Sequence, residues 1–414
     1  MPVNLPEISS QILTPIKGIR LGWAQAHIKK ANRKDLLVIE IAKGSAVSGV
    51  FTQNRFCAAP VTLCKAHLAA KTPIQALVIN TGNANAGTGD IGMADAEKTC
   101  QQLAEIMAIP QSAILPFSTG VILEHLPMDK LLAGLPLAVS NLSADHWADA
   151  ATTIMTTDVA PKAFSKTIEA AQGIVNITGI SKGAGMIHPN MATMLGYLAT
   201  DADISQTLLD EVTKEIADVS FNCISVDGDT STNDSFIIIA TGQGDSAAIT
   251  SRNDEGFADV YQALVEAAQY LAKAIVRDGE GATKFITVNV DDALTVDEAK
   301  TIGFSIAKSP LVKTAMFASD PNLGRVLAAI GYSSRECESL QDLDTNNLSL
   351  YFGDVLVAEK GGRAASYQEE MGQAIMNEAE IEITVKLNRG NASTTVWTCD
   401  FSYDYVRINA EYRT

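Results

Sequence analysis

The sequence lacks a long uninterrupted hydrophobic run. No segment approaches the roughly 20 consecutive apolar residues that a membrane-spanning helix requires. Hydrophobic residues make up 47% of the 414 residues and charged residues 19%, as in globular proteins. The N-terminal segment also lacks a basic start followed by an apolar run and a small-residue cleavage site, which together mark a signal peptide. We therefore expect a cytoplasmic protein with no membrane partner.

Cysteine and histidine are scarce and scattered. The five histidines form neither an HExxH motif nor a zinc-like pair with cysteine, and a Gly-x-Ser-x-Gly elbow is missing. These absences leave zinc peptidases and α/β-hydrolases without support. We therefore expect no metal site. Because a chain of this length does not need disulfides, we expect the cysteines to be reduced core residues, namely Cys57, Cys64, Cys100, Cys223, Cys337 and Cys399.

Basic residues are outnumbered by acidic ones. The chain has 31 Lys and Arg against 48 Asp and Glu, which gives a formal net charge of -17. This excess negative charge repels phosphate backbones, and the sequence shows no basic patch that would overcome the repulsion. We therefore expect no nucleic-acid partner, whereas small cationic substrates fit the charge better.

Gly87–Gly92 matches the GxGxxG pattern of dinucleotide-binding loops but lacks the required context. Six residues, Thr81–Ala86, separate it from the expected end of the preceding strand at Asn80. The next apolar run, Ala113–Phe117, ends without the acidic residue that would bind a ribose. We interpret this segment as an ordinary loop.

Asp227–Asp234 resembles the beginning of a calcium-binding loop. Thr232 occupies the position where such a loop needs glycine, and Ile238 occupies the position of the bidentate glutamate. Because Asp, Asn, Ser and Thr side chains readily bond to their own backbone, we expect a polar turn here.

Short apolar runs alternate with amphipathic segments, which predicts a mixed fold of the α+β class. Apolar residues recur at helical spacing in Ala94–Met107, Thr207–Val219, Ala258–Val276 and Leu311–Ala318. Strand candidates are Leu36–Ile41, Ala76–Ile79, Gly173–Ile177, Phe236–Ala240, Phe285–Val290, Ile381–Val385 and Thr394–Trp397. Leu387–Asn391 has the composition of a hairpin turn, so we expect the last two strands to pair antiparallel.

The length of the chain exceeds that at which one hydrophobic core usually stops growing, so two lobes are expected. The densest cluster of glycine and small residues, Gly179–Gly185, lies near the middle of the chain. No Pro- or Ser-rich linker marks a boundary there. We therefore expect the halves on either side, residues 1–192 and 193–414, to share one interleaved core.

The candidate chemistry concentrates in Ser181–Leu195. Its glycines let backbone N–H groups point toward a ligand, and Pro189 with Asn190 forces a turn ahead of Thr193. Such a turn can strain a peptide bond. If the Ala192 carbonyl lies beside the Thr193 hydroxyl, attack by the hydroxyl shifts the acyl group from nitrogen to oxygen. Water then releases a chain that begins at Thr193.

A free N-terminal threonine can activate itself. Its α-amine, with an unperturbed pKa of about 7.7 to 8.0, acts as base for its own hydroxyl, so no histidine is required. The acyl-enzyme also needs hydrogen-bond donors for its oxyanion. Ser118–Val121, expected as a loop after the run that ends at Phe117, offers a hydroxyl and a backbone N–H.

The segment Lys182–Leu195, KGAGMIHPNMATML, closely resembles the self-cleavage signature of the bifunctional ornithine acetyltransferase/glutamate N-acetyltransferase family of arginine biosynthesis. The resemblance covers nearly the whole chain. Further segments match the family in order, namely Ser118–Val121, Met155–Asp158, Asp227–Asn233, Arg277–Lys284, Ser309–Ala315, Asp320–Arg325 and Ile408–Thr414. Leu123 departs from the family pattern where a small residue is usual, and Leu323 replaces a common tryptophan.

The resemblance implies cleavage between Ala192 and Thr193, with Thr193 as the nucleophile. It also implies that Thr119 and Gly120 form the oxyanion hole and that Glu280 takes part in catalysis. The implied substrate contacts are Thr156, Lys182, Thr193, Glu280, Asn409 and Thr414. These roles suit the side chains, because a lysine can pair with an α-carboxylate and a glutamate can receive an amine or relay its proton.

The fold implied by the resemblance is a layered α/β/β/α assembly like that of self-processing aminopeptidases. Fragments 1–192 and 193–414 would form a heterotetramer with two copies of each. The expected reaction is ping-pong transfer of acetyl from N2-acetylornithine to Thr193 and then to glutamate. No cofactor is implied, and the use of acetyl-CoA as a second donor stays open. Two alternatives also stay open: a self-activated peptidase or amidase that uses water, and a non-catalytic binding protein with an intact chain.

Overall fold

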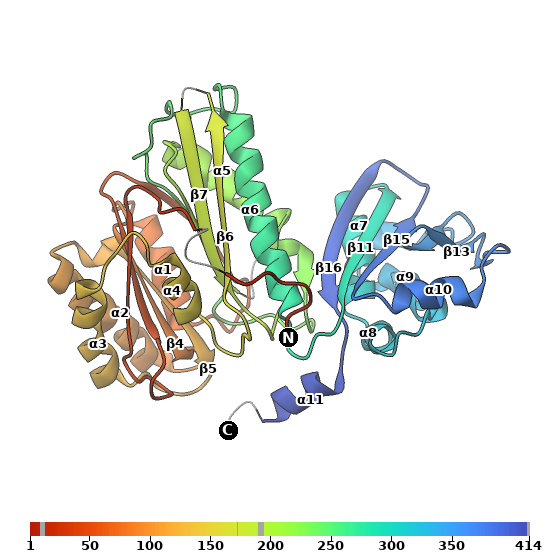
Figure 1. Ribbon diagram of the computed structural model, residues 1–414, viewed down its shortest axis with the longest axis horizontal. Helices are drawn as coiled ribbons and strands as arrows, with labels where there is room; N and C mark the ends of the chain where they lie inside the picture. Colours follow the sequence, from red (N-terminus) through yellow and green to blue (C-terminus); the bar gives the residue numbers. More distant parts are fainter. Residues whose placement is uncertain (9–12, 172, 189–193, 412–414) are drawn as a thin grey trace. The chain divides into compact units, whose positions relative to one another are not determined.

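The computed structural model describes residues 1–8, 13–171, 173–188 and 194–411 (Figure 1). These residues form two compact units. The larger unit comprises Pro6–Asn222 and Asp229–Ile275, and the smaller comprises Met1–Leu5, Cys223–Gly228 and Val276–Thr414. The expectation of two lobes is therefore confirmed.

The first sheet of the larger unit has the strand order β1-β2-β4-β5. β1 pairs antiparallel with β2, and β2 with β4, whereas β4 and β5 run parallel. The bounds are Ile19–Ala24 for β1, Leu36–Ile41 for β2, Ala76–Asn83 for β4 and Ile114–Val121 for β5. The parallel pairing brings the carboxyl ends of β4 and β5 to the same edge of the sheet.

The second sheet of the larger unit has the strand order β3-β10-β8-β7-β6. Its strands are β3 (Ala46–Phe51), β10 (Ser235–Ala240), β8 (Leu195–Thr200), β7 (Gly173–Lys182) and β6 (Lys162–Ala170). Every residue of β8 and of β10 is buried, as expected for central strands that are covered on both faces. β8 pairs with β7 and β10 pairs with β3, so strands from both sides of the proposed cleavage point share this sheet.

The two sheets pack face to face over one hydrophobic core. Alternate residues point into it from both sheets, for example Leu37 and Phe117 from the first and Tyr197 and Ile239 from the second. The outer face of the first sheet packs on α2 (Gly89–Met107) and α3 (Met128–Ser140). The outer face of the second packs on α5 (Gln206–Asp218) and α6 (Phe257–Arg277). The expected α/β/β/α layering is confirmed for this unit.

Two further helices complete the larger unit. α1 (Ala59–Ala69) packs against β5, and α4 (Trp147–Thr153) buries Trp147 against the sandwich core. Short 3-10 turns lie at Gln111–Ala113 and Phe221–Cys223.

The smaller unit is built on one sheet with the order β14-β13-β12-β15-β11-β16-β9. The strands are β9 (Ile224–Ser225), β11 (Phe285–Ala293), β12 (Ser349–Phe352), β13 (Val355–Glu359), β14 (Gly362–Arg363), β15 (Glu380–Lys386) and β16 (Ala392–Cys399). Its helices are α7 (Val296–Ala307), α8 (Pro310–Phe317), α9 (Leu323–Tyr332), α10 (Glu369–Met376) and α11 (Tyr403–Ala410), with 3-10 turns at Ser333–Arg335 and Glu338–Leu340. The caps fit the sequence, because Ser309 accepts a hydrogen bond from Val312 N and precedes Pro310 at the first turn of α8.

The predicted hairpin between the last two strands is wrong. β11 lies between β15 and β16, pairing parallel with β15 and antiparallel with β16. The loop that follows β15 crosses the end of β11, where Leu387 N donates to the Asp291 carbonyl and the N–H groups of Arg389 and Gly390 donate to the Asp292 carbonyl. Leu387–Asn391 therefore does form a turn, but this turn passes around the end of β11, a strand that is distant in the sequence.

The predicted strands and helices are all present, with shifted ends. The strand expected at Ala76–Ile79 continues to Asn83, and the one expected at Gly173–Ile177 continues to Lys182. Gly179 lies inside β7. A glycine fits there because a Cβ would come within 2.7 Å of Leu198 and 3.0 Å of Leu271 on α6.

Two further expectations concern the state of the cysteines and the presence of membrane-spanning helices. All six cysteines are free; Cys57 and Cys337 are half-buried and the other four are buried. Within the described ranges, no helix combines the length and apolar character needed to cross a bilayer.

Candidate active site

Thr119 and Lys182 continue two rows of core side chains from the facing sheets of the larger unit. On β5, Leu115 and Phe117 point into the sandwich core, and the two-residue period places Thr119 next in that row. On β7, Ile180 points into the core and Lys182 follows at the end of the strand. Lys182 Nζ donates to Thr119 Oγ1 over 3.2 Å, and each residue is only 8% exposed. Two residues predicted as catalytic and substrate-binding are therefore in direct contact.

Gly120 belongs to a strand, which corrects the expected loop at Ser118–Val121. β5 continues to Val121, and Gly120 lies opposite Gly82 at the end of β4. Gly120 has φ +138, and a Cβ at this position would come within 2.2 Å of the Gly82 carbonyl carbon. Only glycine fits, because the two strand ends approach each other backbone to backbone.

A polar network fixes the backbone next to Thr119. Ser118 Oγ donates to Asn80 Oδ1 over 2.6 Å on the adjacent strand, and Asn233 Nδ2 donates to the Ser118 carbonyl over 2.9 Å and to the Ala84 carbonyl. Asn233 is buried and comes from the Asp227–Asp234 segment. The place of Asn233 in a polar turn gave no signal of this role in the sequence.

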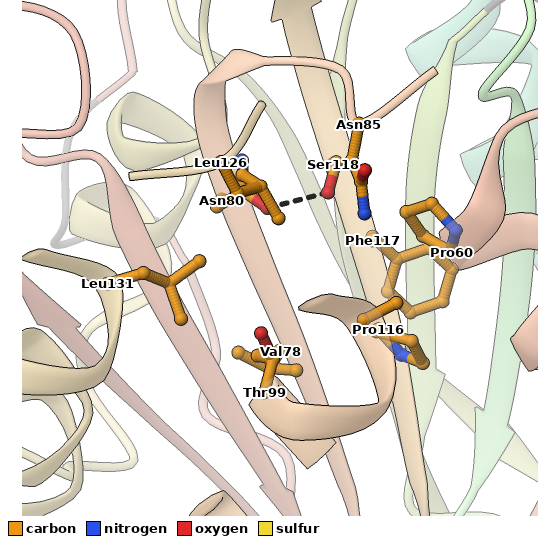
Figure 2. Close-up of a pocket in the computed structure, with 11 residues that line it drawn as sticks. Pro60, Val78, Asn80, Asn85, Thr99, Pro116, Phe117, Ser118, Leu126 and Leu131 are labelled. Carbon is orange, nitrogen blue, oxygen red and sulfur yellow. Dashed lines mark hydrogen bonds between the residues drawn. The ribbon is translucent and has the colours of Figure 1, made fainter. Parts of the chain in front are cut away.

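A small cavity lies beside β5 and is lined by Pro116, Phe117 and Ser118 of that strand (Figure 2). Asn80, Asn85, Thr99 and Ser118 contribute polar groups to its wall, and the volume is about 10 Å³. This is the size of one water molecule. The cavity is too small for a substrate, so it does not form the candidate active site.

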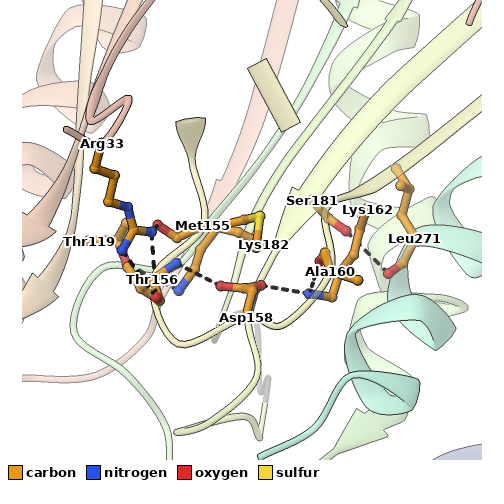
Figure 3. A network of polar contacts seen from close by, with 11 residues as sticks. Arg33, Thr119, Met155, Thr156, Asp158, Ala160, Lys162, Ser181, Lys182 and Leu271 are labelled. Carbon is orange, nitrogen blue, oxygen red and sulfur yellow. Dashed lines mark hydrogen bonds and ion pairs between the residues drawn. The ribbon is translucent and has the colours of Figure 1, made fainter. Parts of the chain in front are cut away.

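Asp158 joins three parts of the site through one carboxylate (Figure 3). Its Oδ1 accepts from Lys162 Nζ over 2.6 Å and from Gly183 N over 2.7 Å, and its Oδ2 accepts from Thr156 N over 2.8 Å. Burial raises the pKa of Asp158, but the charges of Lys162 and Lys182 outweigh burial, and the bonds from Lys162 and Gly183 N lower the pKa further. The net direction is far below the ordinary value, so the carboxylate is ionised at neutral pH.

Thr156 is held from its other side by Arg33. The Arg33 guanidinium donates to the Met155 carbonyl and, over 3.4 Å, to the Thr156 carbonyl. Thr156 is half-buried, and its N–H is bound by Asp158. In the sequence, Asp158 carried no signal beyond its place in a matched motif, and Arg33 carried none.

Glu280 and Asn409 meet within the smaller unit. Asn409 Nδ2 donates to Glu280 Oε2 over 2.8 Å, and Glu280 is 6% exposed. The adjacent Gly281 has φ +71, where a Cβ would come within 2.5 Å of Tyr405 N, and its carbonyl accepts from Ser402 Oγ over 2.6 Å. Asn409 belongs to the helix α11, which is the last element of the described chain.

The buried Asp400 clamps the turn that carries Glu280. Its Oδ1 accepts from Thr283 N over 2.8 Å and from Lys284 N over 2.7 Å, and its Oδ2 accepts from Thr283 Oγ1 over 2.6 Å. This acceptor set holds the segment that follows Glu280 in one conformation.

Two matched motifs of the smaller unit have structural roles. Lys313 is buried and donates to Thr398 Oγ1 over 2.9 Å and to the Cys399 carbonyl, and burial lowers its pKa. Arg325 Nη1 donates to the Leu311 carbonyl over 2.8 Å, which ties α9 to α8. These contacts explain the residues without catalysis.

The two departures from the family pattern lie apart from the polar contacts described above. Leu123 has φ +66, is 64% exposed and packs beside Gly87. Leu323 begins α9 and packs on the core of the smaller unit.

The remaining predicted residues lie outside the described part of the chain. These are Ala192, Thr193 and Thr414, together with the turn expected at Pro189 and Asn190. The structure thus brings Thr119, Gly120, Thr156 and Lys182 together in the larger unit and pairs Glu280 with Asn409 in the smaller one.

The acidic segment at Asp227–Asp234 shows the hydrogen bonds of a polar turn. Asn233 N donates to Ser231 Oγ over 3.2 Å, and Thr232 Oγ1 donates to Asn233 Oδ1 over 2.6 Å. Among the described residues, no group of three or more His, Cys, Asp or Glu side chains is placed to hold a metal ion.

A buried hydroxyl in contact with a buried ammonium, beside an ionised carboxylate in an α/β/β/α sandwich, is the kind of site that an enzyme of the layered α+β class carries. The sequence model of the ArgJ family matches residues 20–414. The chain belongs to the ArgJ family. The family membership predicted from the sequence motifs is therefore confirmed.

The chain is similar to several known proteins. The arginine biosynthesis bifunctional protein ArgJ of Colwellia psychrerythraea is 76% identical over 424 aligned residues, with 100% of each chain covered. The crystal structure of the corresponding protein from Bacillus halodurans is 39% identical with a TM-score of 0.50, and it covers 53% of this chain and 99% of its own. A structure of ornithine acetyltransferase from Mycobacterium tuberculosis, complexed with ornithine, is 31% identical with a TM-score of 0.39, covering 45% of this chain and 97% of its own.

Proposed function

We propose that this enzyme transfers an acetyl group from N2-acetylornithine to glutamate and so produces ornithine and N-acetylglutamate in arginine biosynthesis. The observation that carries the proposal is the buried contact of 3.2 Å between Lys182 Nζ and Thr119 Oγ1. It joins a cation suited to a substrate carboxylate with a hydroxyl suited to an oxyanion.

The chain path supports Thr193 as the nucleophile. Lys182 pairs with Leu195, the first residue of β8, and Thr193 precedes Leu195 by two residues in the sequence. Two peptide units span at most about 7 Å. This short separation along the sequence from the strand partner of Lys182 supports Thr193 as the proposed nucleophile.

The proposed reaction has two acyl transfers after self-cleavage between Ala192 and Thr193. The Thr193 α-amine takes the proton of the Thr193 hydroxyl, whose oxygen attacks the acetyl carbonyl of N2-acetylornithine. The C–N bond breaks, and the proton passes to the departing ornithine amine. The α-amine of glutamate then attacks the acetyl-threonine ester, and the Thr193 oxygen regains a proton.

Thr119 is suited to stabilise the oxyanion in both transfers. The Thr119 oxygen accepts a hydrogen bond from the Lys182 ammonium. The hydroxyl hydrogen of Thr119 can therefore be donated to the oxyanion. A hydroxyl that accepts from a cation is a stronger donor, since hydrogen bonds in a chain polarise one another. Gly120 would supply its backbone N–H as the second donor.

The proposed substrate contacts are those that the family resemblance implies. Lys182 would bind the α-carboxylate of each amino acid, with Thr156, Asn409 and Thr414 completing the contacts. Glu280 would receive the substrate amine or relay its proton.

The proposed assembly is a cytoplasmic heterotetramer of two copies each of fragments 1–192 and 193–414. Strands β7 and β8, from opposite sides of the cleavage point, share their hydrogen bonds, which supports continued association of the fragments. We propose no cofactor or metal, and we leave acetyl-CoA as a second donor to experiment.

One assay tests the function. Purified protein with N2-acetylornithine and glutamate should yield equal amounts of ornithine and N-acetylglutamate, and a denaturing gel should show two fragments, the second beginning Thr-Met-Leu-Gly. Release of acetate that does not depend on glutamate would instead indicate a hydrolase. A parallel reaction with acetyl-CoA and glutamate decides whether acetyl-CoA is a donor.

A further inference from the structure

Asp158 and Lys162 form a fully buried ion pair beside the candidate site (Figure 3). Both side chains are 0% exposed, and Nζ lies 2.6 Å from Oδ1. A buried ion pair adds little stability because desolvation offsets the attraction between the charges. Its location therefore calls for a role other than simple stabilisation of the fold.

The carboxylate of Asp158 touches the backbone at two predicted substrate contacts. Its Oδ2 accepts from the N–H of Thr156, and its Oδ1 accepts from the N–H of Gly183, which shares a peptide unit with Lys182. Displacement of this one group would move both substrate contacts together. Its charge also acts on Lys182, whose ammonium in turn lowers the pKa of Asp158.

Several charged groups surround the segment that carries Thr156 and Asp158. Lys162 begins β6 and Lys182 ends β7, while Asp158 lies in the segment that precedes β6. Arg33, ahead of β2, donates to the carbonyls of Met155 and Thr156. Asp158 thus places an anion beside the ammonium groups of Lys162 and Lys182. Without it, desolvation and repulsion between ammonium groups would favour loss of a proton from Lys182.

We propose that Asp158 is a positioning residue of the acetyl-transfer site that keeps Lys182 charged and directed at Thr119 while it fixes the backbone of Thr156. The inference rests on the proposed function for its catalytic meaning. The effect on the charge of Lys182 does not require turnover and can be measured separately.

The test is the pH dependence of Lys182 acetylation by acetic anhydride, followed by mass spectrometry, in the wild type and in Asp158→Asn. Only the neutral amine reacts, so the midpoint reports the pKa of Lys182. We expect the midpoint in Asp158→Asn to fall by roughly one to three pH units, the effect of losing a nearby opposite charge. The double variant Asp158→Asn/Lys162→Met should recover part of the shift, because it removes one repelling ammonium. An unchanged midpoint in Asp158→Asn would overturn the proposal.

Asp158→Glu provides a second test should the asparagine variant fail to fold. It keeps the charge but moves it, so the midpoint should stay at the wild-type pH while kcat/KM falls roughly 10- to 100-fold through misplacement of the contacts. A midpoint far below that of the wild type would refute the role of the charge. Glu266→Gln is the matched control, because it removes a half-buried carboxylate on α6 that pairs with Lys166 of β6. It should leave both readouts unchanged.

Turnover separates the two proposals. The high-pH limb of kcat/KM for acetyl transfer should move to lower pH in parallel with the labelling midpoint. A wild-type protein that labels as expected but transfers no acetyl would refute the proposed function and retain the effect of Asp158 on Lys182. A labelling shift without a shift of the limb would remove Asp158 from the reaction.

Discussion

Replacement of Thr119 by valine removes one hydroxyl and keeps the β-branched shape that suits β5. The side chain is 8% exposed and ends a row of core residues, so valine should pack in the same space. The change deletes both the acceptor of the Lys182 bond, 3.2 Å long, and the proposed donor to the oxyanion.

The magnitudes of the two losses distinguish a catalytic role from a structural one. A hydrogen bond that involves a charged group contributes about 1.5 to 3 kcal/mol to stability, so the free energy of unfolding should fall by about that amount. Loss of one oxyanion donor lowers kcat about 10²- to 10³-fold, or roughly 2.7 to 4 kcal/mol in the barrier. The Thr119→Val variant should therefore fold and be nearly inactive.

The assay is steady-state transfer of acetyl from N2-acetylornithine to glutamate, with thermal unfolding measured on the same samples. Thr119→Ser retains the hydroxyl and should keep most of the activity. Turnover near the wild-type rate in the valine variant would refute the oxyanion role, and so would a serine variant that is as slow as valine. Both variants should first be checked for two fragments on a denaturing gel, so that loss of cleavage is not mistaken for loss of transfer.

Two further changes test other parts of the proposed function, and a third tests how stability depends on pH. Thr193→Ala should give a single uncleaved, inactive chain, and two fragments on a gel would contradict the cleavage chemistry. Glu280→Gln should keep the melting temperature but lower kcat roughly 10²-fold or more as a proton relay is lost; full activity would reduce Glu280 to a partner of Asn409. The bond from Arg277 lowers the pKa of Glu380 from 4.5 to about 2, so this group contributes stability above the unfolded pKa that is lost as pH falls from 4.5 toward 2. Glu380→Gln should lose less stability than the wild type across that window, by under about 1 kcal/mol because the carboxylate is exposed; equal acid sensitivity in thermal unfolding would contradict this.

The positions of strands and helices could be predicted from the local sequence, whereas the pairing of strands could not. The periods of apolar residues located the strand at Leu36–Ile41 and the helix at Ala258–Val276 to within a residue of their ends. The pairing of strands was less accessible. Leu387–Asn391 has the residues of a hairpin turn, yet β11 inserts between the strands it connects. Partner choice depends on side chains that are distant along the chain, which local periodicity does not report.

The sequence by itself determined the family and the set of candidate residues, because the motif around Thr193 and the segments that match in order are properties of the chain alone. It also supplied the amphipathic periods that give an α+β fold. Only the tertiary structure decided that Thr119 and Lys182 touch, that Gly120 lies on a strand, and that Asp158 connects Thr156 to the peptide of Gly183. These contacts join strands from two sheets whose faces meet over a common core, and their distances arise from packing, which no single segment encodes.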